Sequence, residues 1–115
     1  MEPMAAVERL SALAHDSRLA VFRRLIQRGP DGMAAGELAH ELGIAPPTLS
    51  FHLAHLSRAG LVVSRREGRS ILYAPDHQAM QALVGFLYQN CCGDGACAPA
   101  AARPPAPKRA RRSVS

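Results

Sequence analysis

The most constraining feature of the sequence is a pair of short helical segments separated by only three residues. The first segment spans residues 35–42 and stops at Gly43, a residue type that commonly ends a helix because it adopts the left-handed conformation without strain. The second starts at Pro46-Pro47, since the first turn of a helix tolerates proline, and it closes at Gly60. Two helices joined through residues 43–45 predict helix-turn-helix geometry, in which the second helix normally reads DNA.

Two β-rich segments follow the helical pair. Residues 61–66 (LVVSRR) and 69–74 (RSILYA) are rich in β-branched or aromatic side chains, and only Glu67-Gly68 separates them. A two-residue loop that contains glycine favours the tight turn of a β-hairpin. The sequence therefore predicts a helix-turn-helix followed by a two-stranded wing.

Apolar residues at helical spacing predict further helices on both sides of this unit. Before it, a first short helix covers residues 7–14, and a second is capped by Asp16 and ended by Gly29-Pro30. After it, Asp76 is expected to cap a last helix that fades at Asn90. We expect a mainly α fold: a winged helix-turn-helix with a two-stranded β-hairpin wing, flanked by N- and C-terminal dimerisation helices.

The basic residues are distributed unevenly along the chain. The formal net charge is +5, but five of the 14 Lys and Arg residues lie in residues 101–115, which hold no acidic residue. The nine remaining basic residues are balanced by nine acidic ones, so net charge gives no evidence that the folded part binds nucleic acid. We divide the chain into a DNA-binding and sensor domain, residues 1–98, and a basic Pro/Ala/Arg tail, residues 99–115, expected to be disordered.

Composition and the amino terminus indicate a cytoplasmic protein. No run of about 18 apolar residues exists for a membrane span, and the first residues contain Glu2 and Glu8 but no basic segment of a secretory signal. We therefore expect no membrane partner and reduced thiols. Aromatic residues make up only 4% of the chain and Trp is absent, so the core is small and aliphatic, which favours a dimer.

Three segments together resemble the ArsR family of metal-responsive repressors: LAHDSRLAVFRRL (13–25), GELAHELGIAPPTLSFHLAHLSRAGLV (36–62) and REGRSILY (66–73). The resemblance covers about 85 of the 115 residues. It implies a homodimer whose first and last helices pair across a two-fold axis, and double-stranded operator DNA as the partner.

The predicted reading helix has a buried side and a side available to DNA. Leu49, Leu53 and Leu56 fall together at 100° per residue. On the other side Phe51 is informative, because an exposed apolar ring is unfavourable in water but suits a thymine methyl group. In the wing, arginines suit phosphates or a minor groove. The candidate DNA contacts are Thr48, Ser50, Phe51, His52, His55, Arg58, Arg65, Arg66 and Arg69.

Interpretations of the same residues that involve no DNA contact stay open. The polar side chains of the helix and the wing can simply keep an amphipathic surface soluble. His52 lies between the two sides, so it is either a packed residue or a DNA contact. The resemblance favours contact, since the matching Ser-x-His stretch of the family contacts operator DNA.

A cysteine cluster follows the last predicted helix. Cys91, Cys92 and Cys97 lie within seven residues that include two glycines, so three thiolates can surround one centre. Soft thiolates select soft ions, and a three-sulfur set suits As(III) or Sb(III) better than the tetrahedral site of zinc. A three-Cys cluster after the last helix also resembles the arsenite site of certain ArsR repressors.

Other sites of the family are absent. Residues 33–38 (MAAGEL) hold none of the cysteines that many arsenic-sensing members carry there, and Asp76-His77 lacks the later His or Glu of the zinc-sensing members. A disulfide-based redox sensor, or a site for Cd, Pb or Zn, remains an alternative use of the same cysteines. The remaining alternative is that the three cysteines are incidental thiols in a glycine-rich tail and form no binding site.

Taken together, these features predict a transcriptional repressor that releases its operator when As(III) or Sb(III) binds, and that controls arsenic resistance genes. The alternative is a winged-helix repressor that senses oxidation or another thiophilic metal. An enzyme is not expected, because the sequence has no paired carboxylates in an apolar setting, phosphate-binding glycine loop or Cys-His nucleophile pair. No organic cofactor is expected.

Overall fold

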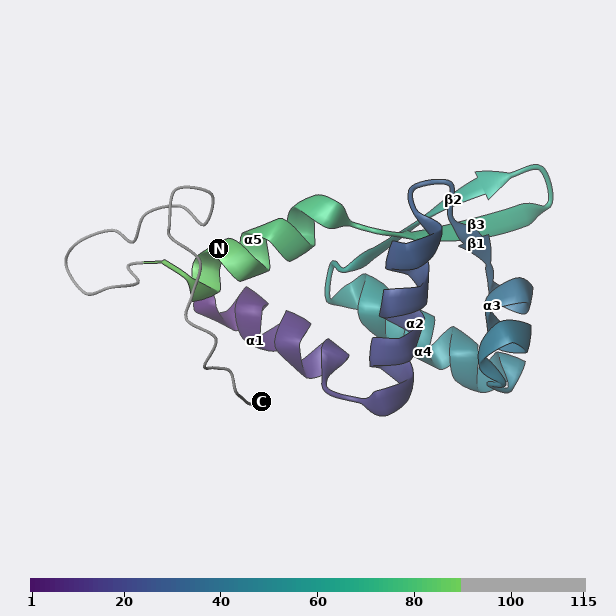
Figure 1. Ribbon diagram of the computed structural model, residues 1–115, viewed down its shortest axis with the longest axis horizontal. Helices are drawn as coiled ribbons and strands as arrows, with labels where there is room; N and C mark the ends of the chain where they lie inside the picture. The colour runs from purple at the N-terminus through teal and green to yellow at the C-terminus, as the bar shows by residue number, and fades with distance from the viewer. Residues whose placement is uncertain (90–115) are drawn as a thin grey trace, which may run out of the picture.

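A computed structural model describes residues 1–89, and it confirms the winged helix-turn-helix (Figure 1). Five helices and three short strands follow one another in this order: α1 (Pro3–Leu13), α2 (Asp16–Arg28), β1 (Met33–Ala34), α3 (Ala35–Leu42), α4 (Pro46–Arg58), β2 (Val62–Glu67), β3 (Ser70–Pro75) and α5 (His77–Leu87). The predicted boundary at residue 98 lies outside the described residues.

The wing sheet has three strands rather than the two expected. β1 pairs antiparallel with β3 through Met33 and Tyr73, and β3 pairs with β2, so the strand order is β1-β3-β2. β1 holds two residues, which is too short for the alternation of apolar and polar residues that identifies a strand. Gly32 allows the pairing, because a Cβ there would lie 2.8 Å from the carbonyl oxygen of Tyr73.

The hairpin between β2 and β3 is confirmed, with its turn displaced by one residue. Glu67 pairs with Ser70, so the two-residue loop is Gly68-Arg69 and not Glu67-Gly68. Gly68 has a φ of 62°, in the left-handed region that such turns require. Arg69 therefore lies at the tip of the wing and not in a strand.

The core lies where α2, α3 and α4 meet the base of the sheet. Its fully buried side chains are aliphatic, as the composition predicts, with Phe22 as the aromatic member. The reading-helix leucines expected inside are buried there. The largest completely buried side chains are Val21, Leu25, Met33, Leu38, Leu49, Leu53, Leu56 and Leu61.

Of the two helix caps predicted from aspartates, one is observed and the other is not. Asp76 caps α5 as predicted, because its Oδ1 accepts a hydrogen bond from the backbone N–H of Ala79 at 3.0 Å. Asp16, the expected cap of α2, is instead the first helical residue. His15 occupies the cap position and its Nδ1 accepts from the backbone N–H of Ser17 at 3.1 Å. Asp16 still places a carboxylate near the positive end of the helix dipole.

Helices α1 and α5 lie beside each other, away from the wing (Figure 1). They bury few of their apolar residues within the chain, mainly Ala6, Ala12, Ala79 and Leu83. Their exposed large apolar residues form a surface that we call the α1–α5 face; its residues are Met4, Val7, Leu10, Val84, Leu87 and Tyr88.

Arg9 connects three helices. Its Nε donates to the carbonyl oxygen of Ala59 at 3.2 Å, just past the end of α4, and its Nη1 donates to the carbonyl oxygen of Ala79 at 3.0 Å in α5. Both bonds have a charged donor, and the Ala59 oxygen lies at the C-terminal end of α4, where carbonyls lack intrahelical partners. The N-terminal helix is thereby fixed to the end of α4 and to the start of α5.

We expect R9M to lower the free energy of unfolding by about 1–3 kcal/mol, because it leaves two backbone oxygens without their charged donor while it keeps an apolar stem. Urea unfolding followed by circular dichroism measures this change. R23M is the matched control, since Arg23 is exposed on α2 and makes no side-chain hydrogen bond within residues 1–89. Equal stability losses in the two variants would contradict the role assigned to Arg9.

Candidate nucleic-acid interface

Helix α4 presents one side to the core and the other to solvent. Leu49, Leu53 and Leu56 are buried against α2 and α3, so the opposite side of the helix, which includes Phe51 and Ala54, faces outward. Thr48 and Ser50 are exposed near the N-terminal end of the helix. This is the end that meets base edges in helix-turn-helix proteins.

Phe51 is the most unusual residue of this exposed side. Its side chain is 60% exposed, and its ring meets the edges of two neighbouring histidines, with centroids 6.0 Å from His52 and 6.4 Å from His55. These contacts hold the ring on the surface without burying it. A rigid apolar group in this position can contact the methyl group of thymine.

His52 is buried, with 5% of its surface exposed, and faces the start of α2. Its ring centroid lies 4.8 Å from that of His15. Its Nδ1 has no hydrogen-bond partner in the described part of the chain. Of the two interpretations of the sequence, the structure places His52 in the packed position.

The surroundings of His52 favour its neutral form. Burial lowers the pKa of His52 below its ordinary value of 6.5, and the positive charges of His15, Arg18 and His55 lower it further. Arg18 is itself buried, and its Nε donates to the carbonyl oxygen of Ala12 at 2.7 Å. A protonated His52 would therefore be a second cation in a poorly solvated place.

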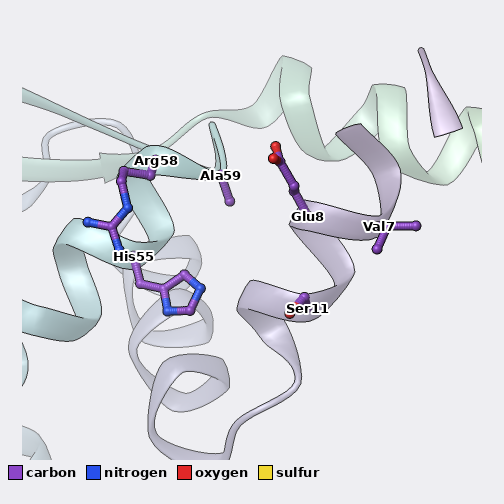
Figure 2. Close-up of a pocket in the computed structure, with 6 residues that line it drawn as sticks. All are labelled: Val7, Glu8, Ser11, His55, Arg58 and Ala59. Atoms are coloured by element: carbon purple, nitrogen blue, oxygen red, sulfur yellow. The ribbon is translucent and has the colours of Figure 1, made fainter. Parts of the chain in front are cut away.

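His55 and Arg58 lie further along α4, beside a pocket of about 510 Å³ between α4 and α1. Figure 2 shows the imidazole of His55 pointing from α4 toward α1. Burial lowers the pKa of His55, with smaller effects from Arg18, Arg58 and His15. Val7, Glu8 and Ser11 line the α1 side of this pocket.

The three wing arginines have different surroundings. Arg65 donates to Glu67 and to two backbone carbonyls of the loop between α2 and β1. Arg66 and Arg69 are exposed, and neither donates a side-chain hydrogen bond within residues 1–89. All three are candidate DNA contacts from the sequence, where alternation along the strand sends Arg65 and Arg66 to opposite faces, and the structure distinguishes one tethered arginine from two without such hydrogen bonds within residues 1–89.

The predicted metalloid site lies outside the described residues, since Cys91, Cys92 and Cys97 all follow residue 89. Within residues 1–89, no group of three or more His, Cys, Asp or Glu side chains is placed to hold a metal ion. Asp76 is used as the cap of α5, which is a structural role. In the same part of the chain, no helix is long and apolar enough to cross a membrane.

Several arginines have a structural role that the sequence does not predict. Arg9, Arg18 and Arg28 each donate to a backbone carbonyl, and none of them was singled out. Their acceptors lie 4 to 70 residues away along the chain. No local pattern marks such a contact, so only the folded arrangement reveals it.

Comparisons with known proteins agree with this geometry. A family described as a helix-turn-helix domain matches residues 13–65. Nodulation protein NolR of Rhizobium meliloti is 36% identical over 78 residues, which cover 68% of this chain and 62% of that protein. The transcriptional regulator YgaV of Escherichia coli K12 is 34% identical over 72% of this chain and 82% of its own length. A biofilm growth-associated repressor of Agrobacterium fabrum is 37% identical over 72% of this chain and 68% of its own length.

Solved structures of transcriptional regulators have the same fold as this chain. An ArsR-like transcriptional regulator from Rhodococcus sp. RHA1 superposes with a TM-score of 0.66 at 25% identity, over 73% of this chain and 76% of that one. A homodimeric winged helix-turn-helix DNA-binding domain from Mycobacterium bovis, described as a possible ArsR-family regulator, gives a TM-score of 0.62 at 27% identity, over 72% and 75%.

The low pKa of His52 predicts a loss of stability in acid. Below pH 6.5 the unfolded chain takes up a proton on this residue before the folded chain does, so the free energy of unfolding falls as the pH falls, by at most about 1.4 kcal/mol for each pH unit. We expect H52Q to lose less stability than the wild type between pH 7.5 and about 5.5. Urea unfolding at the two pH values measures the difference.

The matched control is H77Q, which removes an imidazole exposed to solvent at the start of α5. It should keep the pH dependence of the wild type. An H52Q protein that loses as much stability on acidification as the wild type would refute the assignment to His52.

Proposed function

This chain belongs to the ArsR family of winged helix-turn-helix transcriptional regulators, and we propose that it is a homodimeric repressor whose operator is released when As(III) or Sb(III) binds Cys91, Cys92 and Cys97. It is a DNA-binding transcriptional regulator and not an enzyme.

The observation that carries the DNA-binding role is the exposed side of α4. Thr48, Ser50 and Phe51 project from a helix whose other side is fixed in the core, so the reading side chains are held on a rigid element. The wing adds Arg66 and Arg69 as free cations. We assign the base contacts to α4 and phosphate contacts to the wing.

The α1–α5 face supports a dimer. Its large side chains are 43–69% exposed in the single chain, which is unfavourable for a contiguous apolar surface in water. The related Mycobacterium bovis domain is described as homodimeric. A second copy of this chain would cover the face and hold two α4 helices at a fixed spacing, as a two-fold operator requires.

The position of the cysteines in the sequence supports coupling to DNA. Cys91 follows the end of α5 at Leu87 by four residues, and α5 belongs to the α1–α5 face. Through Arg9, the start of α5 is also fixed to the residue after α4. An ion that alters α5 thus acts on the helices that set the spacing of the two reading helices.

The energetics set a demand on the ion. To convert an operator-bound population into a released one, the ion must favour the released form by about 10⁴-fold, roughly 5.5 kcal/mol. Three thiolates on one soft ion are a strong ligand set. The donor chemistry of Cys91, Cys92 and Cys97 therefore fits As(III) or Sb(III).

The first test uses a labelled duplex that the purified protein has selected from a random pool. We expect arsenite to release this duplex from the wild type, with one arsenite bound and three thiols consumed per subunit. C92S should bind the duplex normally and respond at least tenfold less, because a chelate loses one of its three sulfurs. A chain truncated after Pro99 is the matched control, since it keeps all three cysteines.

Other outcomes identify other inducers. Release by hydrogen peroxide but not by arsenite would replace the metalloid sensor with a redox sensor. Release by Cd, Pb or Zn alone would assign another thiophilic metal. Arsenite that leaves the complex intact, with C92S identical to the wild type, would remove the sensor role.

The second test concerns the dimer. We expect L87D to make the protein monomeric at micromolar concentration, because the new carboxylate cannot be buried in an apolar interface, and to lower DNA affinity at least tenfold. Sedimentation velocity and a gel shift measure the two effects. I26D is the matched control, because Ile26 is an exposed apolar residue on α2, outside the α1–α5 face. A wild type that is already monomeric would contradict this proposal.

A further inference from the structure

The wing is fixed to the helical body at a second place besides the β1–β3 pairing. The loop between α2 and β1, residues 29–32, lies beside the sheet (Figure 1). Three successive carbonyl oxygens of this loop accept hydrogen bonds from guanidinium groups. Arg65 donates through Nη1 to Pro30 at 3.2 Å and through Nη2 to Asp31 at 2.8 Å, and Arg28 donates through Nη1 to Gly32 at 3.0 Å.

The two arginines come from different elements. Arg28 is the last residue of α2, and its Nη2 also pairs with Glu37 at the start of α3. Arg65 comes from the middle of β2, where it pairs with Leu72 of β3. Because β3 separates β2 from β1, the Arg65 side chain reaches past β3 to the loop that precedes β1. It therefore connects the outer strand of the wing to the helical body.

All three nitrogens of the Arg65 guanidinium are in use. In addition to the two carbonyl contacts, its Nε donates to Glu67 Oε2 at 3.0 Å on the same strand. Side chains two residues apart on a strand share a face, so Glu67 is placed to hold the guanidinium in this orientation. The Glu67 carboxylate also neutralises the positive charge of Arg65, which would otherwise attract a phosphate.

Arg66 and Arg69 have the opposite character. Arg66 alternates to the other face of β2, and Arg69 lies in the Gly68-Arg69 turn at the tip of the wing. Both are exposed and neither donates a side-chain hydrogen bond within the described residues. They keep their full positive charge for an anionic partner.

We propose that Arg65 is a positioning residue that fixes the angle between the wing and α4, while Arg66 and Arg69 supply the phosphate contacts of the wing. The inference rests on the proposed contact between the wing and DNA. It divides three neighbouring arginines into one that orients the wing and two that bind the ligand.

The salt dependence of binding separates these roles. Each phosphate contact contributes about 0.9 to the slope of the logarithm of the binding constant against the logarithm of the salt concentration. We expect R66Q and R69Q each to reduce the slope by about that amount. R65Q should weaken binding at every salt concentration and leave the slope unchanged. If the untethered wing holds its bound orientation about one-tenth of the time, the affinity falls about tenfold.

Two further variants test whether the charge or the geometry of Arg65 matters. R65K keeps the positive charge but cannot reproduce the forked donors, so we expect it to resemble R65Q. The double variant R65Q/E67Q keeps the net charge of the pair at zero, and it should also resemble R65Q. Wild-type affinity in either variant would overturn the proposal, as would a slope reduced in R65Q as much as in R66Q.

A measurement without DNA completes the test. Hydrogen exchange of the amides paired between β2 and β3 should accelerate in R65Q and R65K and stay unchanged in R66Q, because only the first two lose the tether. Unchanged exchange in R65Q would overturn the positioning role. A wild type that binds no duplex would instead refute the proposed function, so the two failures are distinguishable.

Discussion

The burial of one side of α4 is the constraint on which the other features depend. Leu49, Leu53 and Leu56 are completely or almost completely buried against α2 and α3, so the helix cannot rotate about its axis without exposing them. Each such side chain contributes about 1.5–3 kcal/mol of apolar burial. This fixed rotation keeps Thr48, Ser50 and Phe51 on the outside, and it places the imidazole of His52 against His15.

Arginine has two uses in this protein. One group donates to backbone carbonyl oxygens and connects elements that are distant in the sequence; it consists of Arg9, Arg18, Arg28 and Arg65. A second group is exposed and available for an anion, and includes Arg58, Arg66 and Arg69. Residues 1–100 have no net charge, but several of their acidic residues, such as Glu37, Glu41 and Glu67, are already paired with arginines. The wing therefore carries a local surplus of unpaired positive charge.

The fold was predictable from sequence wherever local chemistry decides the structure. Gly43, Pro46-Pro47 and Asp76 mark helix ends by their own backbone or side-chain properties, and the structure has these ends. β1 was not predictable, because two residues carry no periodicity and the strand exists only through its pairing with β3. Aspartate is a common N-cap residue, so the sequence points to Asp16 as the cap of α2, but His15 takes that position.

The site was predictable to a lesser extent. The exposure of Phe51 follows from helical periodicity, and it is observed. The burial of His52 and the tether of Arg65 depend on side chains from α2 and its following loop, at positions that the sequence does not connect to them. The roles of the DNA-contact candidates and of the three cysteines stay predictions that the proposed experiments address.

The shortness of β1 has a consequence for the behaviour of the protein in concentrated solution. A long open strand edge invites pairing with a neighbouring molecule and thereby aggregation. Here β1 occupies the edge of β3 at Leu72 and Tyr73, and Pro75 at the end of β3 has no N–H to offer. Two residues of β1 are themselves a poor template for another strand. On the β1 side, the sheet therefore offers another strand only a two-residue edge, and the longer edge of the sheet is that of β2.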